Sequence, residues 1–68
     1  MLHPYELRQL LEREVREAFE QARSANEEID PSALAGAVVM RHQEKPEVQH
    51  RLAFLWLHLE AYVQSLIA

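Results

Sequence analysis

Four histidines in a chain of 68 residues raise the question of a metal site. His42, His50 and His58 follow one another at intervals of eight, which on a helix turns each by about 80° from the last. Zinc-binding helices usually place two ligands three or four residues apart, so that both point at one ion. Glu47 and His50 have that spacing and could form half of a carboxylate-bridged site, with the other half supplied by a symmetric copy. For the single chain we predict no metal ligand and no cofactor.

The chain also lacks the groups that nucleophilic catalysis needs. It has no cysteine and no threonine, and its single glycine excludes a glycine-rich phosphate loop. No serine stands in a strand–turn–helix elbow. General acid–base chemistry needs a concave site with perturbed carboxylates, and a small set of helices offers little concavity. We therefore predict that the protein is not an enzyme and has no catalytic residue.

The charge and composition of the chain argue against nucleic acid and membrane as binding partners. Seven Lys and Arg stand against eleven Asp and Glu, for a net charge of −4, and the arginines alternate with glutamates. Nucleic-acid binding needs clustered positive charge, so the pattern does not favour it. The N-terminus lacks the layout of a secretory signal, and the apolar stretch 52–68 is too short and too interrupted to span a bilayer. We expect a complete, soluble, cytoplasmic protein that contacts no membrane.

Three prolines indicate where the helices begin. Leu7, Leu11 and Val15 recur in one stripe after Pro4, which predicts a helix over about 4–26. Asp30 followed by Pro31 is a strong start signal, because the carboxylate can cap free N–H groups and proline suits the first helical position. The second predicted helix is short, about 31–43.

The single glycine and the third proline lie further along the chain. Gly36 falls inside the second predicted helix, where it costs about 1 kcal/mol relative to alanine. Either a close backbone crossing or mere tolerance would account for it. The third helix is predicted over about 46–67, since Pro46 disfavours helical geometry in the residue before it. One kinked helix from Pro31 to the end is the competing interpretation.

These elements predict an all-α fold in a single domain, 1–68. We expect a three-helix arrangement in which two long antiparallel helices are joined by a short one. A chain this short buries only about 60 % of its unfolded surface, and it has no disulfide to compensate. Hydrophobic residues make up 49 % of it, which favours association into a larger helical bundle.

The third helix carries two apolar faces. Its main stripe recurs every three or four residues and is sufficient to pack on the other helices: Val48, Leu52, Leu55, Leu59, Tyr62 and Leu66. Phe54, Leu57 and Ala61 lie on roughly the opposite side of the helical wheel. A helix that is apolar on opposite sides is either buried on both or exposes a patch that something else covers. The alternative to an interface is a central helix flanked by the other two.

The leading functional hypothesis is therefore a non-enzymatic protein–protein interaction module, a small regulatory or adaptor protein or a minor subunit of an assembly. Its interface would be Phe54, Leu57 and Ala61, with Trp56 and His58 nearby, and its partner a second copy or another helical protein. His58 could make such an interface sensitive to pH. The alternative is a small dimeric DNA-binding regulator or antitoxin-type protein, with helices 31–43 and 46–67 as a helix-turn-helix.

Overall fold

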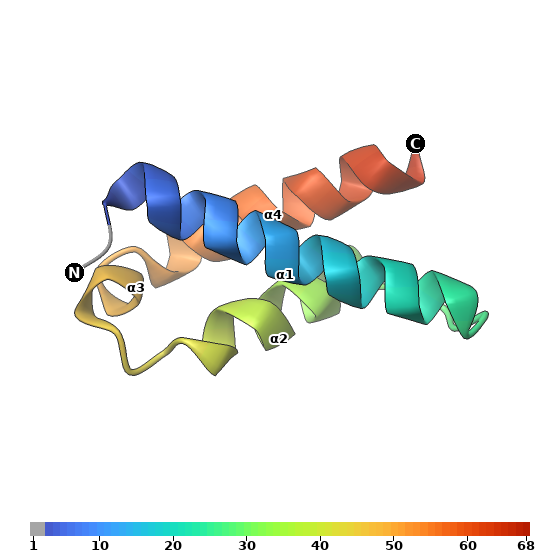
Figure 1. Cartoon of the computed structure of the whole chain (residues 1–68), viewed down its shortest axis with the longest axis horizontal. Coiled ribbons are helices and arrows are strands. Elements are labelled where there is room, and N and C mark those ends of the chain that lie inside the picture. Colours follow the sequence, from blue (N-terminus) through green and yellow to red (C-terminus); the bar gives the residue numbers. More distant parts are fainter. Residues whose placement is uncertain (1–2) are drawn as a thin grey trace.

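The computed structural model describes residues 3–68, and helices are the only regular elements in that range (Figure 1). They are α1 (Pro4–Ser24), α2 (Pro31–Arg41), α3 (Pro46–Gln49) and α4 (Leu52–Ile67). The predicted all-α class is therefore confirmed. None of the helices described is both long enough and apolar enough to cross a membrane.

Local chemistry accounts for where α1 and α2 begin and end. Asp30 Oδ1 accepts hydrogen bonds from the backbone N–H groups of Ser32 and Ala33, as predicted for the start of α2. Asn26 adopts a left-handed φ of 61° just after α1, and the N–H of Glu27 bonds back to the carbonyl of Ala22. This is the hydrogen-bonded ending that closes many helices. The first two helices stop two residues before the predicted ends at 26 and 43.

The third predicted helix, 46–67, is wrong as a single element. α3 makes one turn, and α4 begins only at Leu52. Between them the backbone of Arg51 leaves helical geometry (φ −131°, ψ 26°). Its N–H donates to the carbonyl of Val48, whereas a continuous α-helix would use the carbonyl of Glu47. The chain changes direction there (Figure 1). Residues 42–45 are not helical either, so a continuous kinked helix from Pro31 is also excluded.

The two long helices run parallel, not antiparallel as predicted. α1 and α4 both run from the end of the molecule near the N-terminus toward the other end, and α2 runs in the opposite direction (Figure 1). Side chains along the pair agree with this direction, because Glu12 pairs with His58 and Arg16 interacts with Tyr62. The prediction treated the second helix as a short connection between the two long ones. In the structure α2 instead carries the chain back to the end of the molecule where α1 began.

The core lies where the three longer helices meet. α1 contributes the predicted stripe of Leu7, Leu11 and Val15. The other buried apolar side chains are Phe19 from α1; Ala35, Val38 and Val39 from α2; Val48 from α3; and Leu55, Leu59 and Val63 from α4. α4 thus faces the core on one side, which determines what its other side presents.

Candidate interaction surface

The outward side of α4 is uncharged and open to solvent. Phe54 and Leu57 remain 55 % and 66 % exposed, and Ala61 is exposed as well. Ala53 and Gln64 are exposed on the same side, since residues three and four apart share one side of a helix. We call Ala53, Phe54, Leu57, Ala61 and Gln64 the outer α4 face.

Neither α1 nor α2 covers the outer α4 face, so the central-helix alternative is wrong for the single chain. Exposed large apolar side chains are common singly, but here two lie one turn apart on a helix without an intervening charge. Whether this face forms an interface stays a prediction.

Trp56 does not belong to that face. Its indole lies against Gly36 of α2, and its Nε1–H donates to the carbonyl oxygen of Ser32 at 2.9 Å. A Cβ added to Gly36 would come within 2.3 Å of the Trp56 ring. Packing therefore explains why position 36 is a glycine. The group that approaches it is an indole ring, not the backbone of another helix. Trp56 thus joins α4 to α2, and whether it also takes part in an interface stays a prediction.

His58 lies at the border of the outer α4 face. Its Nε2 is 2.6 Å from Oε2 of Glu12, which joins α4 to α1. Its ring also stacks on Phe54, with centroids 6.4 Å apart and planes inclined by 10°. His58 thus holds Phe54 from one side while its own polar atom is directed to α1.

His42 makes a contact between two helices. His42 Nε2 lies 2.9 Å from Oε1 of Glu14, with Arg41 3.7 Å from the same oxygen. This cluster joins the end of α2 to the middle of α1. Within residues 3–68, no three side chains of metal-binding type come together, and Glu47 and His50 find no third ligand.

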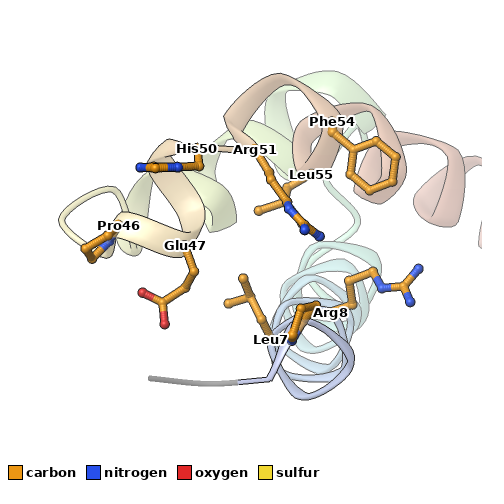
Figure 2. A pocket seen from close by; sticks show the side chains of 9 residues that line it. Leu7, Arg8, Pro46, Glu47, His50, Arg51, Phe54 and Leu55 are labelled. Carbon is orange, nitrogen blue, oxygen red and sulfur yellow. The ribbon is translucent and has the colours of Figure 1, made fainter.

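A pocket that the sequence did not predict lies where the start of α1, α3 and the start of α4 meet (Figure 2). Its cavity is about 260 Å³. The apolar lining consists of Pro4, Leu7, Pro46, Phe54 and Leu55, and the polar lining of Arg8, Glu47, His50 and Arg51. Phe54 belongs both to this pocket and to the outer α4 face. The antiparallel prediction placed the start of the first helix and the start of the third at opposite ends of the molecule, so it gave no reason to expect a pocket between them.

One arginine of α1, Arg16, has a shifted pKa. The carboxylate of Glu20, which accepts a hydrogen bond from Arg16, and next the hydroxyl of Tyr62 raise the pKa of the Arg16 guanidinium. Arg16 and Glu20 form a solvent-exposed ion pair, which contributes little to stability.

Comparisons of this chain with protein-family models, with curated protein sequences and with solved structures give no match.

Proposed function

We propose that this chain is a non-enzymatic interaction module whose contact surface is the outer α4 face. The observation that carries the proposal is the exposure of Phe54 and Leu57 over more than half of their surface, side by side on a helix whose opposite side is buried. Full burial of a Phe or Leu side chain is worth about 1.5–3 kcal/mol. Burying the exposed parts of the Phe54 and Leu57 side chains against a partner would therefore favour association.

The spacing of the face suits another helix. Phe54, Leu57, Ala61 and Gln64 follow one another at three, four and three residues, the repeat by which two helices pack along a seam. The bulky residues lie in the first half of α4 and the small Ala61 in the second. An antiparallel α4 from a second copy would set each Leu57 against the other copy's Ala61, so large meets small. A second copy is therefore the partner to test first.

The DNA-binding alternative has less support. A recognition helix has to be long enough to lie in the major groove, and α3 consists of four residues. Arg41 and His42, which a basic patch would need, are already paired with Glu14.

The test is solution mass by light scattering over a concentration series. The expected result is a species of twice 8.0 kDa for wild type and a folded monomer for Phe54→Asp/Leu57→Asp. A matched control is Tyr5→Asp/Met40→Asp, which changes two exposed apolar side chains outside the outer α4 face and should leave the dimer intact.

Two outcomes would count against the proposal. A wild type that stays monomeric at millimolar concentration contradicts self-association. A Phe54→Asp/Leu57→Asp protein that unfolds, as judged by far-UV circular dichroism, contradicts the claim that these side chains are dispensable for the fold of the single chain.

A further inference from the structure

The pocket at the start of α4 combines an apolar floor with cationic groups at its opening. Leu7 and Leu55, both almost fully buried, form part of its lining, and Phe54 stands beside them. In Figure 2 the Arg51 side chain extends from the start of α4 toward α1, where Arg8 lies. The pocket thus offers an apolar surface and two guanidinium groups on neighbouring elements.

Neither guanidinium is neutralised within the described part of the chain. Among residues 3–68, the side chains of Arg8 and Arg51 make no hydrogen bond or ion pair, whereas Arg16 and Arg41 each pair with a glutamate. Glu47 also lines the pocket, but its carboxylate points away from both arginines in Figure 2. Guanidinium groups bind carboxylates well because their planar N–H donors match the two oxygens.

The start of α4 adds to the positive character of this place. Arg51 occupies the capping position, and no side chain accepts a hydrogen bond from the first N–H groups of the helix. Free N–H groups at a helix start, together with the helix dipole, favour an anion. The helix start thus adds to the positive potential that Arg8 and Arg51 create at the pocket.

We propose that this pocket binds a small organic anion, a carboxylate on a short apolar chain, with the chain on Leu7, Leu55 and Phe54 and the carboxylate between Arg8 and Arg51. The size of the ligand follows from the cavity, which at about 260 Å³ lies just below the range typical of sites for drug-sized molecules. The chemistry follows from the charges, because an apolar floor alone would not select an anion.

Octanoate is the probe, titrated into ¹⁵N-labelled protein while amide chemical shifts are followed by NMR. We expect saturable shifts at the residues that line the pocket. Acetate shares only the charge and 1-octanol only the chain, so each should bind at least about fivefold more weakly, as should octanoate to Arg8→Gln/Arg51→Gln. Arg13→Gln/Arg23→Gln, which removes two exposed arginines of α1 outside the pocket, should bind octanoate like wild type.

Self-association could hide Phe54, so the titration is repeated on Leu57→Asp. That change disrupts the outer α4 face without touching the pocket lining. The absence of saturable shifts up to about 10 mM octanoate in both proteins would overturn the proposal, since even weak specific ligands bind in that range. Equal affinity of the Arg8→Gln/Arg51→Gln protein would overturn it as well. Neither result bears on whether α4 mediates association.

Discussion

At the scale of single residues, the contact between Gly36 and Trp56 explains most about how α2 and α4 fit together. The indole occupies the space that any other side chain at position 36 would need. Its N–H is satisfied by the carbonyl of Ser32, one helical turn before Gly36. A large, half-buried aromatic side chain thus has both its apolar body and its polar atom accommodated by α2.

Gly36→Ala should therefore destabilise the protein, although alanine is the better helix former. Replacing a helical glycine by alanine normally gains about 1 kcal/mol. Here the added methyl group would meet Trp56 at 2.3 Å, so the ring must move, and overpacking of this kind costs about 1–3 kcal/mol. We expect a lower free energy of unfolding, measured by urea denaturation.

Trp56→Leu provides the control for this prediction. With the indole removed, the same Gly36→Ala change should raise stability, because only the helix-propensity gain remains. A Gly36→Ala protein more stable than wild type, with Trp56 present, would show that the indole shifts without cost.

At the scale of elements, the helix starts were predictable because their causes lie within a few residues. Pro4, Pro31 and Pro46 each stand at the first position of a helix, as the sequence indicated. The break between α3 and α4 was not predictable in this way. Val48 and Leu52 continue an apolar repeat, and no glycine or proline interrupts residues 47–67. The break therefore has no local signal in the sequence, unlike the helix starts at the prolines.

Asp30→Ala tests the most local of these signals. The Asp30 carboxylate accepts from the N–H groups of Ser32 and Ala33, which lack partners inside the helix. Removing it should lower the free energy of unfolding by about 1 kcal/mol, measured by urea denaturation. Asp30→Asn keeps an accepting oxygen and should retain most of the stability. Equal losses for the two variants would mean that charge near the helix start, and not capping, is what matters.

At the scale of the whole molecule, the direction of α1 relative to α4 decides where the candidate sites lie. The helical wheel of the C-terminal segment already separated Phe54, Leu57 and Ala61 from the main stripe, and the structure shows these three exposed. The pocket could not be predicted in this way, because Arg8 and Arg51 line one pocket only when the starts of the two long helices lie at the same end. The relative direction of α1 and α4 depends on whether α2 brings the chain back to the end where α1 began. The apolar periodicity within each helix carries no information about this.

The parallel arrangement makes a specific energetic prediction. Glu12 of α1 and His58 of α4 lie 2.6 Å apart and are both partly exposed, so their coupling should be modest, about 0.5–1 kcal/mol. A double-mutant cycle with Glu12→Gln and His58→Gln, measured by urea denaturation, isolates that value.

A second cycle that combines Glu12→Gln with His50→Gln serves as the control, since the structure gives Glu12 no contact with His50. Coupling in the first cycle and none in the second is the result expected from the contacts of the structure. Zero coupling in the first cycle would show that the Glu12–His58 contact adds nothing to the packing of α1 on α4, and the energy that holds the two helices together would then come from the buried apolar side chains alone.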